Sequence, residues 1–367
     1  MTLILTQQDV EDCIDIRECV KLMEQTFFDL GERNAVTTAR RHSYLPLGQS
    51  GDEEAFTHRW YLFKSMDGGS SRLRTHALRI SSEIIEEVKK EGQISYQQIP
   101  SLPGRRWMGL IQLFSIEDGA LLSIMPDGHI QQARVGATSA VAADYLARKD
   151  AKTVGMLGSG FQAQTQVTAL CAVRNIEKIK VYSPNRENRN TFARIYSEKC
   201  QTNIVPVYSM EEAVKDVDIL VCATNSFTPL IKKEWIQPGM HINTVAYEVD
   251  ASILNMCSLV ALRSIREQTS DHWAGDVTPS LAEVKFHKEP PASIMEKVHT
   301  LGDVVQRRVG RTNPDEITCH PAIVPGLSGG GLGLQFTPVA TQVYQKAISE
   351  GRGHAVPLEW FLQSVHP

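Results

Sequence analysis

One hexapeptide constrains the fold of this chain more than any other feature, and it reads Gly158-Ser159-Gly160-Phe161-Gln162-Ala163. It follows an apolar run at residues 154–157, which predicts a strand, and precedes residues 164–173, which predict a helix. In such a turn Gly158 permits the tight bend, Gly160 lets the backbone approach a pyrophosphate, and Ala163 lets helix and strand pack closely. The free N–H groups at the helix N-terminus then favour a phosphate.

The surroundings of this turn decide how it is interpreted, because a tight turn in another α/β protein can show the same spacing. A second predicted strand at residues 178–182 completes a βαβ unit of the expected length. Further short apolar runs follow, with helix-length segments between several of them, at residues 204–207, 218–223, 241–245 and 259–262. Parallel strands require crossovers, so this alternation predicts an α/β fold with a Rossmann unit that binds a dinucleotide.

The residues after the strand at 178–182 bear on which dinucleotide is bound. NAD-specific sites place an Asp or Glu there to hold the ribose 2′-hydroxyl, whereas this chain has Ser183, Asn185 and Arg186 around a proline. An arginine at this point can pair with a 2′-phosphate. The sequence therefore favours NADP(H), with NAD(H) possible, unless Arg186 and Arg189 only begin the next helix as solvated side chains.

The first 130 residues show a different pattern. A strand is predicted at residues 3–5 and a helix at 14–30, and strand-like runs follow, separated by Gly-containing turns, at 60–63, 76–80 and 109–114. The polar residues 81–106 predict an excursion from that sheet. Further helices are predicted at 133–147 and, after a glycine-rich turn, at 338–349. A length of 367 residues suits two domains with a cleft between them.

Composition narrows the class of partner. A net charge of −4 and a pI near 6.3 argue against nucleic acid, which needs a basic face. No apolar stretch is long enough to predict a membrane span, and the N-terminus does not resemble a signal peptide. The seven cysteines form no C-x-x-C pair, which favours reduced thiols in a cytoplasmic protein. Asp271, His272 and Asp276 cluster in a predicted loop but lack metal-ligand spacing, so no metal is predicted.

Several segments of the chain resemble the ornithine cyclodeaminase/mu-crystallin family, in the family's order. They are the N-terminal strand and helix ending at Gly31, residues 119–128, residues 133–140, residues 157–164, and the tail from residue 333 onward. The resemblance implies a homodimer with a discontinuous α+β domain for substrate binding and dimerisation at residues 1–130 and 318–367. It implies a Rossmann NAD(P)-binding domain at residues 131–317. It also implies hydride exchange at the carbon next to the carboxylate of a small 2-imino or 2-amino acid.

Three arginines represent the substrate site in this resemblance. Arg134 corresponds to the arginine that holds the substrate carboxylate in the family, and Arg40 or Arg41 to an early arginine with the same role. We assign substrate binding to Arg41, Arg79 and Arg134, because guanidinium groups grip a carboxylate through two parallel hydrogen bonds. Arg79, which we also assign as a catalytic residue, stands where the family usually has a lysine, but a guanidinium cannot give up its proton. Each arginine could instead form a surface ion pair.

One departure from the family follows the predicted strand at 241–245. Cyclodeaminases have an aspartate in the turn after this strand, but here the chain continues Ala246-Tyr247-Glu248-Val249-Asp250, which argues against cyclodeamination. Glu248 or Tyr247 is the candidate proton donor to the imine nitrogen, although Glu248 aligns equally well with a structural Glu-Leu-Asp of the family. The ends of two predicted strands add further cofactor-binding residues, namely Ala223, Thr224 and Val245.

The sequence thus predicts an NADP(H)-dependent oxidoreductase that reduces a ketimine or imine next to a carboxylate. Alternatives with a similar site are an alanine-dehydrogenase-like or opine-forming amino acid dehydrogenase and an ornithine cyclodeaminase-like lyase. A different class is also open, namely a cofactor-binding protein with little catalysis, like the crystallins of the family.

Overall fold

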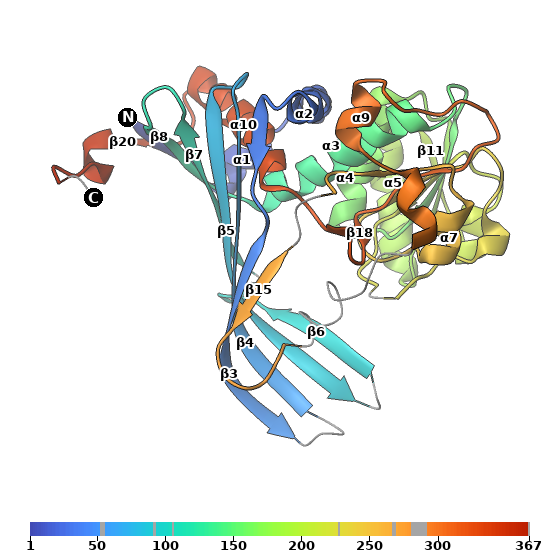
Figure 1. The fold of residues 1–367 in the computed structure, drawn as a ribbon, viewed down its shortest axis with the longest axis horizontal. Helices are drawn as coiled ribbons and strands as arrows, with labels where there is room; N and C mark the ends of the chain where they lie inside the picture. Colours follow the sequence, from blue (N-terminus) through green and yellow to red (C-terminus); the bar gives the residue numbers. More distant parts are fainter. Residues whose placement is uncertain are drawn as a thin grey trace.

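The computed structural model describes residues 1–51, 56–90, 93–104, 106–226, 228–265, 269–279 and 292–365. Two sheets organise these residues and lie side by side (Figure 1). One is a mixed sheet built mainly from the N-terminal third of the chain, and the other is an all-parallel sheet built from the middle and C-terminal parts. The helix α3 (Gly128–Leu146) runs between them.

The mixed sheet has the order β15-β3-β4-β5-β7-β8-β1-β20, with β2 paired to β4 and β6 paired to β5. Its strands are β1 (Thr2–Ile4), β2 (Ala35–Thr37), β3 (Arg41–Gly51), β4 (Phe56–Ser70), β5 (Thr75–Lys90), β6 (Gln93–Ile99), β7 (Met108–Ser115), β8 (Leu121–Pro126), β15 (Ser270–Trp273) and β20 (His354–Val356). The helices beside it are α1 (Gln7–Cys13), α2 (Ile16–Gly31) and α10 (Phe336–Glu350).

The parallel sheet has the order β11-β10-β9-β12-β13-β17-β14-β16. Its strands are β9 (Thr153–Leu157), β10 (Lys178–Tyr182), β11 (Asn203–Pro206), β12 (Ile219–Cys222), β13 (His241–Thr244), β14 (Leu259–Leu262), β16 (Val298–Thr300) and β17 (Thr318–His320). The connecting helices include α4 (Phe161–Val173), α5 (Arg186–Cys200), α6 (Met210–Val214), α7 (Ala251–Met256) and α9 (Leu301–Val305). A short hairpin of β18 (Ile323–Val324) and β19 (Ser328–Gly329) follows.

The predicted α/β fold with a Rossmann-type sheet is confirmed, and all six strands expected between residues 152 and 262 are present. The strand order reverses at β9, because β10 lies on one side of it and β12 on the other. In open parallel sheets, ligands bind at such a switch point, outside the carboxyl ends of the strands. The glycine turn of residues 158–163 leaves the sheet at this point.

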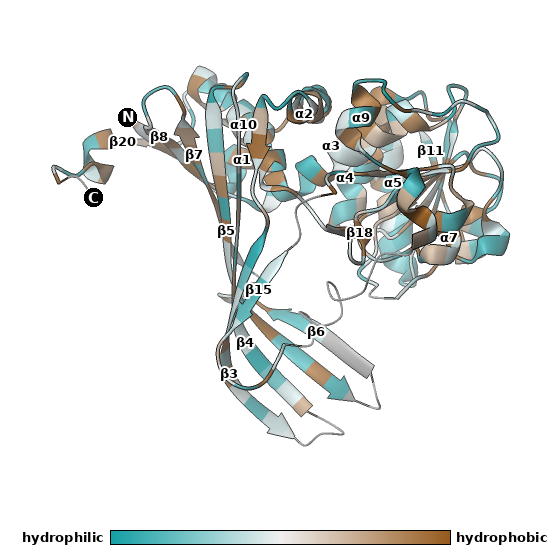
Figure 2. Ribbon diagram, viewed as in Figure 1, coloured by the Kyte–Doolittle hydropathy of each residue, from teal (hydrophilic) through white to brown (hydrophobic). Residues whose placement is uncertain are grey.

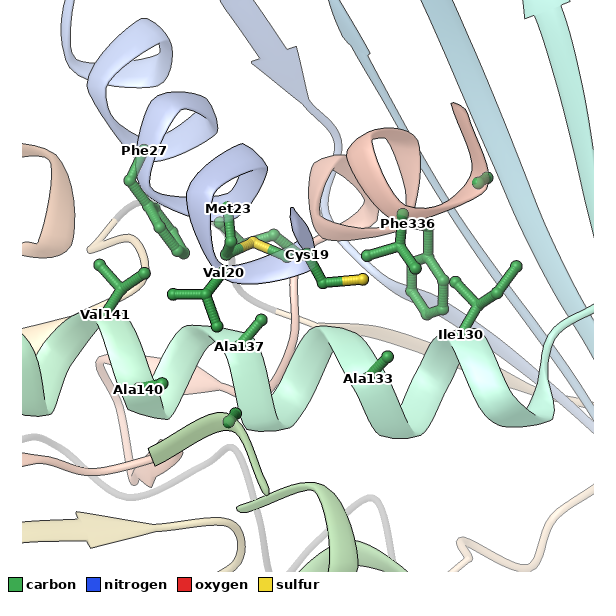
Figure 3. Packing of buried hydrophobic residues seen from close by; sticks show 14 of the residues in the cluster. Cys19, Val20, Met23, Phe27, Ile130, Ala133, Ala137, Ala140, Val141 and Phe336 are labelled. Atoms are coloured by element: carbon green, nitrogen blue, oxygen red, sulfur yellow. The ribbon is translucent and has the colours of Figure 1, made fainter. Parts of the chain in front are cut away.

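Small side chains on α3 let the helices pack closely between the two sheets. Ala133, Ala137 and Ala140 follow one another at helical spacing and face Val20, Met23 and Phe27 of α2 (Figure 3). Phe336, the first residue of α10, is fully buried beside the same helix. This core fixes the position of α3, which carries Arg134 toward the parallel sheet.

Two segments differ from the sequence-based expectation. Residues 81–90 and 93–99 stay in the mixed sheet: β5 continues to Lys90 and β6 returns along it, forming a long, largely hydrophilic arm with β3 and β4 (Figures 1 and 2). The segment around Asp271, expected as a loop, forms β15 and pairs in parallel with β3. This strand belongs to the mixed sheet although it lies inside the span predicted for the Rossmann domain, and the domain boundaries stay a prediction.

Candidate active site

The turn at the end of β9 has the geometry that a pyrophosphate requires. Gly158 has φ of +108°, and a Cβ there would lie 2.2 Å from the carbonyl oxygen of Ala223, so only glycine fits. A Cβ on Gly160 would meet nothing within 4 Å, and no side chain caps the N-terminus of α4. Oε1 of Gln162 is buried without a hydrogen-bond partner in the described structure. Ala163 is fully buried against the sheet, and the turn fits an anionic diphosphate.

The end of β10 lies next to this turn, and the N–H of Gly158 donates to the carbonyl of Tyr182 over 2.8 Å. Ser183 is buried, and Asn185 caps α5 by accepting a hydrogen bond from the N–H of Asn188. Arg186 is exposed and makes no ion pair within the described ranges. A guanidinium is therefore available at the position where the adenosine ribose of a bound dinucleotide would lie, and residues 183–186 contain no carboxylate.

A cavity of about 220 Å³ lies at the carboxyl ends of the parallel strands. Four predicted site residues line it: Arg134 from α3, Gln162 from the glycine turn, and Thr224 and Val245 after β12 and β13. Pockets for drug-sized ligands span roughly 300–1,000 Å³, so this one suits a small substrate. A second, more open hollow of about 860 Å³ contains none of the predicted site residues.

Arg134 is 3% exposed and is held in place by neutral groups. Its Nε and Nη2 donate to Oε1 of Gln131 over 3.1 and 2.8 Å, and its Nη1 donates to Oε1 of Gln335 over 3.0 Å. The guanidinium lies over the Phe336 ring, 5.1 Å from its centre. Burial and the nearby positive charge of Arg263 lower the pKa of Arg134. Amide oxygens orient this side chain but do not neutralise its charge.

Two glycines of the cavity wall, Gly330 and Gly331, lie next to two arginine side chains. A Cβ on Gly331 would lie 2.0 Å from Nη1 of Arg134, and a Cβ on Gly330 would lie 3.6 Å from the Nη atoms of Arg40. Glycine at residue 331 therefore leaves the room that the Arg134 guanidinium occupies.

The other two predicted substrate ligands are placed differently. Arg41 is exposed, whereas Arg40 lines the cavity with its Nε buried and without a hydrogen-bond partner in the described residues. Of the two alternatives, the structure therefore brings Arg40 to the site and leaves Arg41 outside it. Arg79 does not line the cavity, because its Nε donates to Asp127 over 2.6 Å. The Arg79 guanidinium also lies near the Phe336 ring, 5.8 Å from its centre.

Glu248, the predicted proton donor, is 0% exposed and does not line the cavity. One carboxylate oxygen accepts hydrogen bonds from the N–H and the hydroxyl of Thr224, over 3.0 and 3.1 Å. The other accepts from the N–H of Ala246 over 2.7 Å. Burial raises the pKa of Glu248 to about 7. The arrangement places Thr224 on the cavity wall and leaves both oxygens of Glu248 occupied.

His42 lines the cavity and was missed by the sequence analysis. Its Nδ1 lies 2.8 Å from a carboxylate oxygen of Asp271, which also accepts a hydrogen bond from the Tyr44 hydroxyl over 3.3 Å. Its Nε2 is buried and has no hydrogen-bond partner among the described residues. Burial lowers the pKa of His42 to about 4, and the charge of Arg40 acts in the same direction. A carboxylate that orients an imidazole is the arrangement of a general acid or base.

Other candidate groups lie outside the cavity. His76 contacts Asp67 over 3.0 Å, and His129 lies 3.5 Å from Glu11. No cluster of three or more His, Cys, Asp or Glu residues placed to hold a metal occurs in the part of the chain that the structure describes. Within the same ranges, none of the helices combines the length and the apolar character needed to cross a membrane.

Comparison with known proteins finds related reductases and dehydrogenases. The model of the ornithine cyclodeaminase/mu-crystallin family matches residues 95–351. A Δ1-pyrroline-2-carboxylate reductase of Bacillus cereus is 30% identical over 256 residues, covering 68% of this chain and 74% of that protein. An alanine dehydrogenase of Archaeoglobus fulgidus is 27% identical over 367 residues, covering 97% of this chain and 98% of that protein.

A solved structure extends the similarity to the whole fold. The Δ1-pyrroline-2-carboxylate reductase of Thermococcus litoralis, in complex with NADH and L-proline, is 29% identical with a TM-score of 0.72. The match covers 97% of this chain and all of that one. The resemblance inferred from the sequence motifs is thereby confirmed.

Proposed function

This chain belongs to the ornithine cyclodeaminase/mu-crystallin family, and from that premise we propose that it is an NADP(H)-dependent oxidoreductase that reduces a 2-imino carboxylate to a 2-amino acid. The observation that carries the proposal is the buried, uncompensated guanidinium of Arg134 in a small cavity beside the glycine turn. Related proteins named as reductases act on the same class of bond. The sequence at residues 246–250, which lacks the aspartate of cyclodeaminases in the turn after β13, argues against the lyase alternative.

The residues of the cavity would have separate roles in the reaction. Arg134 and Arg40 bind the substrate carboxylate and so fix the neighbouring imine carbon. When bound, the reduced nicotinamide supplies a hydride to that carbon, and a proton is needed at the imine nitrogen. His42, oriented by Asp271, donates this proton through Nε2. The C=N bond thereby becomes CH–NH. His42 has then lost one proton, which it regains from water.

His42 must be protonated to play this role, although burial and the charge of Arg40 lower its pKa. A substrate carboxylate beside Arg40 offsets the positive charge of that residue, which raises the pKa of the imidazole. Substrate binding and proton uptake are therefore coupled in this proposal.

The experiment that tests the function is NADPH oxidation with a panel of cyclic imines and of 2-oxo acids mixed with ammonia or methylamine. Turnover with an imine is expected and rejects a protein that only binds cofactor. Turnover when an amino acid such as alanine replaces ammonia as the amine, with none on ammonia itself, would favour an opine-forming dehydrogenase. Release of ammonia from ornithine without net NADPH oxidation would instead identify a cyclodeaminase.

The preference for NADP(H) is tested separately, because the related reductase from Thermococcus litoralis is described with NADH. We expect NADPH to bind more tightly than NADH, and the Arg186→Gln variant to lose that preference while NADH affinity stays unchanged. A charged hydrogen bond to phosphate contributes roughly 1.5–3 kcal/mol, about 10- to 100-fold in Kd. Tighter binding of NADH by the unmodified protein would overturn this part of the proposal.

A further inference from the structure

The cavity region contains more positive charge than a monocarboxylate needs. Five cationic side chains interact electrostatically around it: Arg40, Lys64, Arg79, Arg134 and Arg263. Three carboxylates lie among them in the described residues, and each has a partner. Asp127 pairs with Arg79 and Glu83 with Lys64, whereas Asp271 contacts the neutral imidazole of His42, so the five cations exceed the three carboxylates by two charges.

Three guanidinium groups on the cavity wall are consequently left without a carboxylate within ion-pair distance in the described structure, namely Arg40, Arg134 and Arg263. Burying unpaired charge is costly. Burial lowers the pKa of Arg40 and of Arg263 to about 10, so both stay charged near neutral pH. Such a set of cations is stabilised once anionic groups enter the cavity.

Arg263 is the least expected of the three. It is the first residue after β14, is 6% exposed, and lines the same cavity as Arg134. β14 lies four positions along the sheet from β9, and neighbouring strands are roughly 4.8 Å apart, so about 19 Å separates it from the glycine turn. In the proposed function the dinucleotide phosphates bind at the glycine turn and at the end of β10, on the other side of β9. They are therefore not the partner of Arg263.

We propose that Arg263 binds a second carboxylate of the substrate, and that the preferred substrate is the imine of a short 2-oxo dicarboxylic acid. In this arrangement Arg134 and Arg40 hold the carboxylate next to the imine carbon, and Arg263 holds the distal one. The inference rests on the proposed function, because it names the substrate class of the same cavity. It also explains why a cavity of about 220 Å³ is lined by three arginines.

The kinetic test compares imines formed from ammonia with oxaloacetate or 2-oxoglutarate against those formed with pyruvate or 2-oxobutanoate. The unmodified enzyme is expected to show the higher kcat/KM for a dicarboxylate. The Arg263→Gln variant should lose about 10- to 100-fold in kcat/KM for dicarboxylates, which is the range for one charged hydrogen bond, and change less than threefold for monocarboxylates. Arg263→Lys, which keeps the charge, should retain part of the preference.

Controls separate this effect from general damage. Arg134→Gln should weaken both substrate classes, and Arg194→Gln, an exposed arginine on α5, should affect neither. Thermal unfolding of each variant identifies a fold defect. Equal losses for both classes in Arg263→Gln, or a preference of the unmodified enzyme for monocarboxylates, would overturn the inference while leaving the reductase function intact.

A binding measurement keeps the inference testable if the reductase function itself fails. Calorimetric titration of the protein with NADP, using succinate and butyrate as non-reacting probes, should give at least tenfold tighter binding of succinate. Arg263→Gln should abolish that difference. Equal affinity for the two probes would reject a second carboxylate site whether or not imines are reduced.

Discussion

The pairing of His42 with Asp271 is the residue-scale feature that most affects the proposed chemistry. The carboxylate fixes one imidazole nitrogen, and the other has no partner among the described residues. His42→Asn keeps a group that can contact Asp271 but lacks the second nitrogen. We expect kcat for imine reduction to fall about 100-fold or more, the usual contribution of a positioned acid, with NADPH affinity unchanged.

Steady-state kinetics across pH, together with NADPH binding, check this prediction. Asp271→Asn should show a smaller loss and a shifted pH profile, because it disturbs the orientation of His42 without removing it. If His42→Asn kept kcat within threefold of the unmodified enzyme, the proton would have to come from another group or from water.

Glu248 is better described as a positioning residue than as an acid. Its carboxylate accepts three hydrogen bonds that hold Thr224 and Ala246. In Glu248→Gln one acceptor is replaced by a donor, which leaves a buried N–H unsatisfied and costs about 1–3 kcal/mol of unfolding free energy. We expect weaker NADPH binding through Thr224, and kcat at saturating NADPH within about twofold.

Fluorescence titration of NADPH and kinetics at saturating cofactor distinguish the two roles. A proton donor would show the opposite pattern, with unchanged NADPH affinity and a kcat reduced by about two orders of magnitude.

The choice between Arg40 and Arg41 could have been made from the sequence. Residues 40, 42 and 44 share one face of the extended chain, since His42 and Tyr44 are buried and Arg41 and Ser43 are exposed. Period-two alternation could have selected Arg40 over Arg41. Arg263 gave no such signal, because its position on the cavity depends on the order of the strands in the sheet rather than on its neighbours in sequence.

At the scale of elements, the glycine turn permits a matched pair of substitutions. Gly158→Ala forces a side chain into a positive φ and against the Ala223 carbonyl, which costs roughly 1–3 kcal/mol from the backbone conformation alone. Gly160→Ala meets no protein atom within 4 Å, so its unfolding temperature should match that of the unmodified protein. Its Cβ nevertheless occupies the space that a pyrophosphate approaches.

The prediction is therefore a lower Tm for Gly158→Ala, and for Gly160→Ala a normal Tm with at least tenfold weaker NADPH binding, about 1.4 kcal/mol. Thermal unfolding and calorimetry measure the two quantities. Unchanged NADPH affinity in Gly160→Ala would place the pyrophosphate elsewhere.

The elements of the parallel sheet could be predicted because its strands are short, apolar and separated by helices. The extension of β5 could not, because the positions that alternate as buried include Ser81, Glu83 and Glu87, which sequence analysis treats as polar. β15 was missed for a related reason: its pairing with β3 joins residues more than 200 positions apart, and Asp271 is buried only because that pairing brings it to His42.

At the scale of the whole molecule, buried histidines couple folding to pH. His241 and His320 are buried on the neighbouring strands β13 and β17 of the parallel sheet, and burial lowers the pKa of each to about 3. With the pKa of His42 lowered to about 4, all three bind protons more readily in the unfolded chain, where histidine titrates near 6.5. The unfolded state therefore gains protons below pH 6.5 that the folded state does not.

The sign of the effect follows from this difference. The free energy of unfolding should fall as the pH drops below about 6.5, by up to about 1.4 kcal/mol per pH unit for each histidine. Glu248 opposes this between about pH 4.5 and 7, because its raised pKa favours the protonated folded state. Because the three histidines outnumber this one glutamate, the protein should lose stability as the pH falls.

Urea unfolding at pH 7.5, 6.0 and 5.0 measures how the free energy of unfolding changes with pH. In the unmodified protein Nδ1 of His320 contacts the carbonyl of Ala261 over 2.7 Å, and His320→Asn keeps a donor for that carbonyl. Asparagine cannot be protonated, so the pH dependence of the free energy of unfolding should correspond to about one proton fewer than in the unmodified protein. Glu248→Gln should steepen the slope, since it removes the opposing group. A free energy of unfolding that stays constant from pH 7.5 to 5.0 would mean that these histidines are protonated in the folded protein, and that the pocket holding His42 admits water and charge more readily than its burial indicates.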